Sequence, residues 1–274
     1  MKKFYIIANL DKEYAGKTRQ EICDYLESRG GTCLFGAQEN PDHHTDSRAV
    51  PEDTDCIITI GGDGTLIQAA RDLAGRSIPM VGINRGHLGF LTQVSRQEDI
   101  GQALEALLSE RYSLERRMMV LGSVIRQDRE IFRDIALNEI AVTRPEPLKV
   151  LRFEVLVNDE YLNQFAADGV LVATPTGSTA YNLSAGGPVM APAGRMMVMT
   201  PICPHTLNGR SIVLSAEDQV RIHLLSSGRV AFDGDSFCEL EAGDEIRVEK
   251  SALETVMVKV RQISFMQNLS NHLG

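Results

Sequence analysis

The chain has 274 residues, 43% of them hydrophobic, which is enough for two domains that each have a core. Its 37 acidic and 28 basic residues give a net charge of −9, which argues against a general nucleic-acid or anionic-membrane surface, so any phosphate site must be local. No apolar stretch approaches the roughly 20 residues that cross a bilayer. The five cysteines show no metal-ligand or redox spacing, so we expect a soluble, cytoplasmic protein with reduced thiols.

The first hundred residues alternate between strand-like and helix-like segments. Residues 4–8 are apolar and follow two lysines, but charged residues at 11–13 end the run too early for a signal peptide. We therefore expect a first buried strand there. A helix-like segment follows at 18–28 and a strand-like one at 32–35, and this βαβ order predicts a parallel sheet.

Residues 37–55 are polar and rich in turn formers, which predicts an exposed connection. His43 and His44 lie in this segment and have the chemistry of metal ligands. Adjacent histidines in a solvated acidic loop are more often simply soluble side chains. The sequence therefore leaves the ligands of any metal unassigned.

The most informative segment is Gly61-Gly62-Asp63-Gly64-Thr65, between an apolar run at 56–60 and a helix-like stretch at 66–74. Its three glycines let backbone N–H groups approach an anion, and the helix N-terminus adds unpaired donors and its dipole. Asp63 is the one charged side chain in this loop, and a carboxylate accepts a hydroxyl proton, which indicates phosphoryl transfer to an alcohol. The predicted phosphate-binding residues are Gly61, Gly62, Gly64 and Thr65.

Asp63-Gly64 is also a strong short hairpin signal. The following residues decide against a hairpin, because apolar side chains recur at helical spacing and Thr65 with Gln68 resembles a capping box. A strand-like run at 80–83 then leads into a second glycine-containing loop at 84–91. Both loops leave the carboxyl end of the predicted sheet, where ligands bind in open α/β sheets.

The pattern changes after a helix-like segment at 100–109. From about residue 113 short strand-like runs follow one another with turn signals, which predicts a second, mostly antiparallel domain. The predicted strands are 119–126, 130–138, 151–157, 169–173, 211–214, 219–225 and 229–232. The tail from 256 to 269 begins strand-like and turns polar, and the sequence leaves open whether it packs on the first domain.

Hydroxyl side chains are dense after the strand-like run at 169–173. They are Thr174, Thr176, Ser178, Thr179 and Ser184, and Tyr181 adds a flat aromatic face. Uncharged donors and acceptors beside an aromatic ring suit ribose, amide groups and base edges. Ser and Thr also cap their own turns, so each hydroxyl alone has an equally good structural interpretation, but their density favours ligand binding.

Two further polar groups lie at strand ends. Asn138 and Glu139 follow an apolar run, and neighbouring side chains on an ideal strand point to opposite faces, so a shared ligand requires a bend there. Alone, the pair is weak support for a site, because edge strands carry such pairs. Asp233-Gly234-Asp235 has the form of a hairpin turn, and we favour that interpretation.

Together these segments resemble the NAD kinase family. The resemblance runs in the right order through residues 61–65, 82–84, 86–91, 138–139, 168–187 and 201–207. Lipid kinases and phosphofructokinases carry similar glycine–aspartate loops, so that motif alone is not specific. The segment from Thr174 to Tyr181, Thr-Pro-Thr-Gly-Ser-Thr-Ala-Tyr, is much more so.

The resemblance implies an α/β plus all-β fold: an N-terminal Rossmann-like α/β domain with a C-terminal β-sandwich-like domain, and substrate in the cleft between them. Residues 1–112 would form the nucleotide-binding domain with the glycine loop, residues 113–255 the NAD-binding domain and residues 256–274 the tail. The implied reaction transfers the γ-phosphoryl group of ATP to the 2′-hydroxyl of the adenosine ribose of NAD, producing NADP. It requires a divalent metal cation, Mg²⁺ bound with ATP. We expect NAD and ATP as substrates, a homodimer or homotetramer, and no nucleic-acid or membrane partner.

The resemblance makes Asp63 the catalytic base, in agreement with its position in the loop. The implied NAD-binding residues are Asp63, Gly64, Phe90, Asn138, Glu139, Lys149, Asp168, Thr179, Ala180, Tyr181, Asn182, Leu183, Ser184 and Cys203. Tyr181 would stack on a ring, and Asn138 with Glu139 would bond ribose or base. Ala166 departs from the basic or imidazole side chain of many relatives, and Asp235 stands where Gln is expected. Either change could alter nucleotide affinity while leaving the catalytic carboxylate intact.

Cations usually neutralise the transition-state charge of phosphoryl transfer. Besides Mg²⁺ the candidates are Lys149, Arg85, Arg144 and Arg152, among which the sequence does not choose.

Two other functions remain as alternatives. A lipid or sugar kinase would share the glycine loop, but a lipid kinase needs a basic or apolar docking surface, against which the net acidity counts. A non-catalytic dinucleotide sensor would keep the cleft and lose turnover, against which the retained Asp63 counts.

Overall fold

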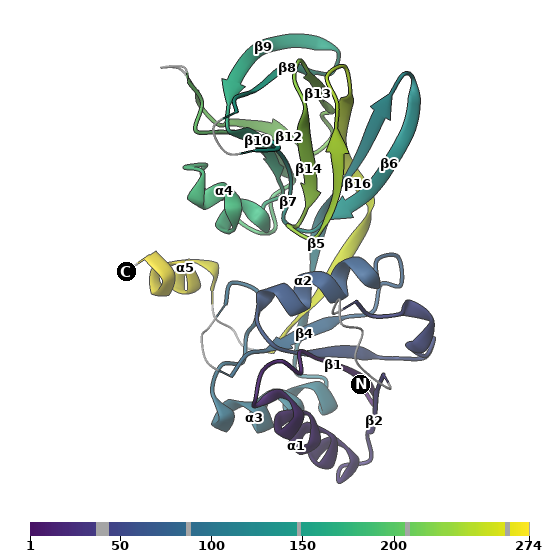
Figure 1. The fold of residues 1–274 in the computed structure, drawn as a ribbon. Coiled ribbons are helices and arrows are strands. Elements are labelled where there is room, and N and C mark those ends of the chain that lie inside the picture. The colour runs from purple at the N-terminus through teal and green to yellow at the C-terminus, as the bar shows by residue number, and fades with distance from the viewer. Residues whose placement is uncertain (37–43, 86–88, 147–148, 206–208, 261–263, 274) are drawn as a thin grey trace. The chain divides into compact units, whose positions relative to one another are not determined.

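The computed structural model describes residues 1–36, 44–85, 89–146, 149–205, 209–260 and 264–273 (Figure 1). The chain divides into two compact units. Unit 1 contains Met1–Arg117 and Glu254–Gly274, and unit 2 contains Met118–Leu253. The sequence placed the domain boundaries after residues 112 and 255, whereas the chain passes between the units inside two long strands, β5 (Ser113–Arg126) and β16 (Glu245–Lys259).

Unit 1 contains the predicted parallel sheet, in the order β2–β1–β3–β4, with the end of β16 beside β4. The strands are β1 (Lys3–Ala8), β2 (Thr32–Phe35), β3 (Cys56–Ile60) and β4 (Met80–Ile83). The helices are α1 (Ala15–Glu27), α2 (Asp63–Asp72) and α3 (Gln97–Leu108), with a 3₁₀ turn at Ser47–Ala49. Helices α1 and α3 cover one face of the sheet and α2 covers the other (Figure 1), so β3 and β4 are buried throughout.

The predicted order of strand, glycine loop and helix is confirmed, since β3 leads directly into α2. The predicted capping box of Thr65 and Gln68 is wrong. The helix begins at Asp63 with Gly62 as N-cap residue, which has no side chain to cap it, and Gln68 bonds His44 and Asp72. Asp63 therefore lies in the first helical turn, where free N–H groups and the helix dipole favour a negative charge.

Unit 2 consists of two sheets in which described neighbouring strands pair antiparallel, which confirms the predicted second domain. One sheet has the order β12–β11–β10–β7–β14–β15. In the other, β13 lies between β16 and β8, β9 follows β8, and the β5–β6 hairpin joins through β5. The bounds are β6 (Arg129–Ala136), β7 (Glu139–Thr143), β8 (Leu151–Val157), β9 (Glu160–Ala167), β10 (Gly169–Ala173), β11 (Met196–Ile202), β12 (Ile212–Ser215), β13 (Val220–Leu224), β14 (Gly228–Phe232) and β15 (Ser236–Leu240). Phe153 and Ile222 of one sheet share a core with Phe232 of the other.

The sequence missed strands β7, β9, β11 and β15. Strand β9 begins with five exposed residues in succession at 160–164, and β11 is buried along almost its whole length. Neither strand therefore shows the alternation of apolar and polar residues that marks a half-buried strand.

The tail continues as β16 to Lys259 and ends in helix α5 (Phe265–Leu273), which the sequence described only as a polar segment. All five cysteines are free thiols. Within the described ranges, no helix combines the length and the apolar character needed to cross a membrane.

Candidate active site

Asp63 is held by backbone N–H groups from the loop that follows β4. Its Oδ2 atom accepts the N–H groups of Phe90 and Leu91, at 2.8 and 3.1 Å, and its Oδ1 atom accepts that of Thr92 at 2.9 Å. The carboxylate is thereby fixed beside the carboxyl ends of β3 and β4, the edge of a parallel sheet at which ligands bind.

Gly89 allows this loop to approach the carboxylate. A Cβ atom at Gly89 would overlap the Asp63 side chain, lying 2.6 Å from its Oδ2 atom. The sequence attributed the loop to nucleotide binding through Phe90. In the structure the Phe90 main chain bonds Asp63 while its ring stacks on His272 of α5, with 4.2 Å between ring centroids. Residues 86–88 of this predicted motif lie outside the described part of the chain.

The glycine loop has one position that requires glycine and two that leave space. Gly61 has a φ of 156°, and a Cβ atom there would lie 3.0 Å from Thr65 Cβ. At Gly62 and Gly64 an added Cβ atom would have no neighbour within 4 Å. Open space beside the main chain of these two residues, next to the start of α2, is what an approaching phosphate needs.

The Asn138–Glu139 pair lies at a bend between β6 and β7, as a shared ligand requires. Thr174 holds the bend with two bonds: its N–H group donates to Asn138 O at 2.8 Å and its hydroxyl donates to Leu137 O at 2.6 Å. Gly177 packs directly against it, since a Cβ atom there would lie 2.7 Å from Asn138 Cα. Thr174 and Gly177, at the start of the predicted hydroxyl-rich segment, thus stabilise the bend that carries Asn138 and Glu139.

The Glu139 side chain is almost completely buried, with 7% of the residue exposed. Its Oε2 atom has no hydrogen-bond partner among the described residues. Burial first, and then the neighbouring Asp233, raise the pKa of Glu139 to about 8, while a bond from the Tyr181 main chain acts in the opposite direction. At neutral pH the carboxyl group is therefore mostly protonated, and its proton is available to an acceptor on a ligand.

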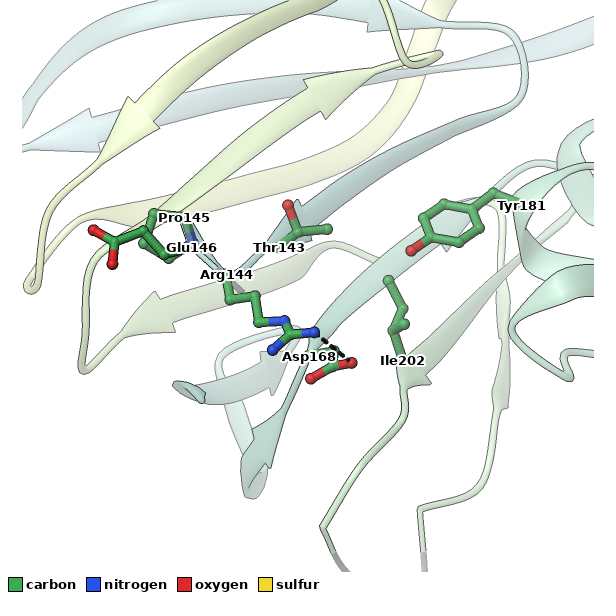
Figure 2. Close-up of a pocket in the computed structure, with 7 residues that line it drawn as sticks. All are labelled: Thr143, Arg144, Pro145, Glu146, Asp168, Tyr181 and Ile202. Carbon is green, nitrogen blue, oxygen red and sulfur yellow. Dashed lines mark ion pairs between the residues drawn. The ribbon is translucent and has the colours of Figure 1, made fainter. Parts of the chain in front are cut away.

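A cavity of about 330 Å³ opens in unit 2 and brings together Asp168 and Tyr181, two of the predicted NAD-binding residues (Figure 2). Arg144 Nη2 lies 3.3 Å from Asp168 Oδ2, and both side chains remain about one-third exposed. The full lining is Thr143, Arg144, Pro145, Glu146, Asp168, Tyr181 and Ile202. Of the four candidate cations, Arg144 is the one that lines this cavity, whose volume suits part of a dinucleotide.

Most of the predicted hydroxyl ligands bond backbone carbonyl groups instead of facing solvent. The hydroxyls of Thr174, Ser178 and Thr179 each donate to a carbonyl group nearby in the fold. Asn182 is fully buried; its amide group donates to two carbonyls and accepts the Thr200 hydroxyl at 2.7 Å. These side chains stabilise the local backbone of the segment. This is the alternative considered for each hydroxyl, that Ser and Thr cap their own turns. Ala180, Leu183 and Ser184 lie beside Tyr181 in or next to α4 (Tyr181–Ser184).

Lys149 and Cys203 are absent from the lining of this cavity. Lys149 Nζ pairs with Glu146 at 2.9 Å, and both side chains are exposed. Cys203 is exposed just after β11, with a φ of 45°. Of the motif that follows it, residues 206–208 are not described by the structure. In the predicted connection, His44 Nδ1 lies 2.9 Å from Asp72, while His43 is outside the described ranges.

The sequence placed Gly89 in the second glycine-containing loop without assigning it a role in the site, and it missed Thr92. Their contribution is main-chain geometry, which side-chain patterns do not record. The available signal was the glycine itself, because a glycine in a ligand-facing loop often marks a close approach of the backbone.

Comparisons with known proteins find relatives over the whole chain. Residues 4–112 match the ATP-NAD kinase N-terminal domain family, and residues 137–260 match the ATP-NAD kinase C-terminal domain family. A curated NAD kinase of Lachnospira eligens is 41% identical over 100% of both chains, and one of Agathobacter rectalis is 38% identical over 100% of this chain and 99% of the relative.

Solved structures give the same result. Yeast NADH kinase complexed with NADH superposes with a TM-score of 0.86 at 25% identity, covering 100% of this chain and 88% of that one. An NAD kinase from Archaeoglobus fulgidus in complex with ATP superposes with a TM-score of 0.81 at 26% identity, covering 98% and 97%.

Proposed function

Because the chain belongs to the NAD kinase family, we propose that it transfers the γ-phosphoryl group of ATP to the 2′-hydroxyl of the adenosine ribose of NAD. The observation that carries this proposal is the Asp63 carboxylate, fixed at the start of α2 beside the glycine loop. The 2′-oxygen forms a bond to the γ-phosphorus, and the bond from that phosphorus to the β–γ bridging oxygen breaks. The hydroxyl proton passes to Asp63, and ADP and NADP are the products.

The other residues are proposed to bind and orient the two substrates. The N–H groups of Gly62 and Gly64 and the start of α2 receive phosphate charge. Asn138 and Glu139 bond ribose or base, and Asp168 with Tyr181 contacts the dinucleotide at their shared cavity. The support is the open space at the two glycines, the raised pKa of the buried Glu139 carboxyl group and the cavity lining.

The direct test is NADP formation by the purified protein from NAD, ATP and Mg²⁺, read through an NADP-specific dehydrogenase. Turnover supports the proposal. Absence of turnover, with NAD binding still measurable by calorimetry, contradicts it and favours the dinucleotide sensor.

Tyr181→Ala is expected to raise the KM for NAD by roughly 3- to 10-fold, because an aromatic stacking contact contributes about 0.5–1.5 kcal/mol beyond its buried area. The ring is 40% exposed and lines the cavity, so it is accessible to a ligand. Steady-state kinetics at saturating ATP measure the effect. Tyr181→Phe, which keeps the ring, separates stacking from the hydroxyl group, and unchanged KM and kcat in Tyr181→Ala contradict the assignment.

We propose that the divalent cation arrives with ATP. Among the residues the structure describes, no three or more His, Cys, Asp and Glu side chains are grouped so that they could hold a metal. Mg²⁺ typically binds through substrate phosphates with one or two carboxylates, so phosphate oxygens suffice as its main ligands. When bound, the cation neutralises the charge of the transferred phosphoryl group.

Removal of divalent cations with EDTA is therefore expected to abolish NADP formation while leaving NAD affinity, measured by calorimetry without ATP, unchanged. Added Mg²⁺ should restore turnover. Turnover that persists after dialysis against EDTA contradicts the metal requirement. Loss of NAD affinity contradicts the proposal that the cation binds with ATP.

From the same family membership we propose a cytoplasmic homo-oligomer, either a homodimer or a homotetramer. Static light scattering of the purified protein measures the number of subunits, and a monomeric mass contradicts the proposal.

A further inference from the structure

The Asp233 carboxylate lies at the bend between β6 and β7. It projects from the β14–β15 turn, where Asp233 and Gly234 have φ values of 52° and 74°, which confirms the predicted hairpin. Asp233 Oδ2 accepts the N–H group of Leu137 at 2.7 Å, and Oδ1 accepts those of Asn138 at 2.7 Å and Glu139 at 3.1 Å. Three successive backbone N–H groups form an anion-binding concavity, and here a side chain of the same protein fills it.

The carbonyl groups of the bend are held as completely as its N–H groups. Leu137 O and Asn138 O accept from Thr174, and Glu139 O accepts the Asp233 N–H group at 3.0 Å. All three N–H groups and all three carbonyl groups of Leu137, Asn138 and Glu139 therefore have partners inside the protein. The bend replaces regular strand geometry, in which Asn138 and Glu139 would point to opposite faces.

We infer that Asp233 is a positioning residue for NAD binding, which acts through Asn138 and Glu139 by holding the bend between β6 and β7. This inference rests on the proposed function, in which that pair binds NAD. Without the carboxylate, three N–H groups lose their acceptor at a half-buried position. A donor left without a partner costs more than its bond contributes, so the bend relaxes and the two side chains change direction.

Asp233 also supplies the charge that faces Glu139. The groups around the Glu139 carboxyl are Asp233 from the β14–β15 turn and Tyr181 from α4. Burial, followed by Cys203, Asp168 and Glu139, raises the pKa of Tyr181, so its phenol is neutral in the working range. Asp233 therefore provides the negative charge that adds to burial in raising the pKa of Glu139. Loss of that charge lowers this pKa, and Glu139 then loses its proton at a lower pH.

Asp233→Asn tests the inference at constant side-chain size. The KM for NAD is expected to rise roughly tenfold or more, because bonds to a charged acceptor are lost, while kcat changes less. In the wild type, kcat/KM for NAD should fall as the pH rises through about 8, where Glu139 ionises. In Asp233→Asn this alkaline limb should move to lower pH, because the charge that faces Glu139 is lost and a relaxed bend would also expose the Glu139 carboxyl group.

Further variants test whether the alkaline limb of kcat/KM reports the ionisation of Glu139. In Glu139→Gln the side chain cannot ionise, so the limb should disappear, and Asp233→Asn added to it should move no limb. Asp128→Asn is the matched control, because it removes one charge at an exposed side chain from the β5–β6 turn of the same unit, where Asp128 also has a positive φ, of 60°, and its KM and limb should equal those of the wild type. If Asp233→Asn fails to fold by circular dichroism, Asp233→Glu keeps the charge at a shifted position and should raise KM with at most a small shift of the limb.

The inference is overturned if Asp233→Asn keeps the wild-type KM and an unmoved limb, or if its changes are no larger than those of Asp128→Asn. Calorimetry with NAD in the absence of ATP separates it from the proposed function. Wild-type protein that forms no NADP overturns the proposed reaction. Weaker NAD binding by Asp233→Asn than by the wild type supports the positioning role whether or not NADP forms.

Discussion

Replacement of Asp63 by Asn is expected to lower kcat for NADP formation by about 10²- to 10⁴-fold, the usual contribution of a positioned general base. The amide has almost the same size as the carboxylate but does not take up the proton of the 2′-hydroxyl. The assay is the coupled NADP measurement under saturating NAD, ATP and Mg²⁺.

The contacts of Asp63 determine which control measurements Asp63→Asn needs. An Asn side chain can present only one oxygen to the three N–H groups of Phe90, Leu91 and Thr92, and its amide donor opposes at least one of them. Thermal unfolding and NAD affinity must therefore be measured beside kcat. Near wild-type turnover with unchanged NAD affinity contradicts the assignment of Asp63 as the base.

Gly89→Ala should lower kcat by about 10²-fold, because a displacement of roughly 1 Å at a catalytic group has an effect of that size. The new methyl group would overlap the Asp63 carboxylate, so the carboxylate, the loop at 89–92 or both must move. Every side chain assigned to NAD binding or catalysis is kept in this variant. A loss of turnover therefore shows that the position of Asp63, as well as its presence, is required.

Gly16→Ala is the matched control for Gly89→Ala. Gly16 lies in α1 of the same unit, and an added Cβ atom would have no neighbour within 4 Å. Its kcat should equal that of the wild type, and its unfolding free energy should rise by about 0.5–1 kcal/mol, since alanine is the better helix former. Wild-type kcat in Gly89→Ala shows that the loop does not hold Asp63 in this way during turnover.

Local sequence signals predicted unit 1 and the position of Asp63 because each signal is complete within a few residues. The apolar run of β3, the glycines that follow it and the helical spacing of α2 are adjacent in the chain. The capping box failed because glycine at the N-cap position starts the helix earlier than Thr65 suggested. A start without a capping side chain leaves no pattern to recognise.

The second half of the site depended on partners that are distant in the chain. Asp233 and Asn138 are 95 residues apart, and the hairpin signal at Asp233 described its backbone correctly without indicating what its carboxylate binds. In the hydroxyl-rich segment the density of hydroxyls suggested ligand contacts, and that assignment stays a prediction. Ser178 and Thr179 donate to carbonyl groups, which is the local role weighed as the alternative for each hydroxyl, because Ser and Thr bond nearby backbone groups.

The bend at residues 137–139 also has a consequence for folding. It is completed by Thr174 and by Asp233, so it exists only when β7, β10 and β14 are already paired. Contacts of such long sequence separation form slowly, because the chain must close long loops before they form. NAD affinity should therefore appear late in refolding, after most secondary structure has returned, and it reports when the sheet containing β7 is complete.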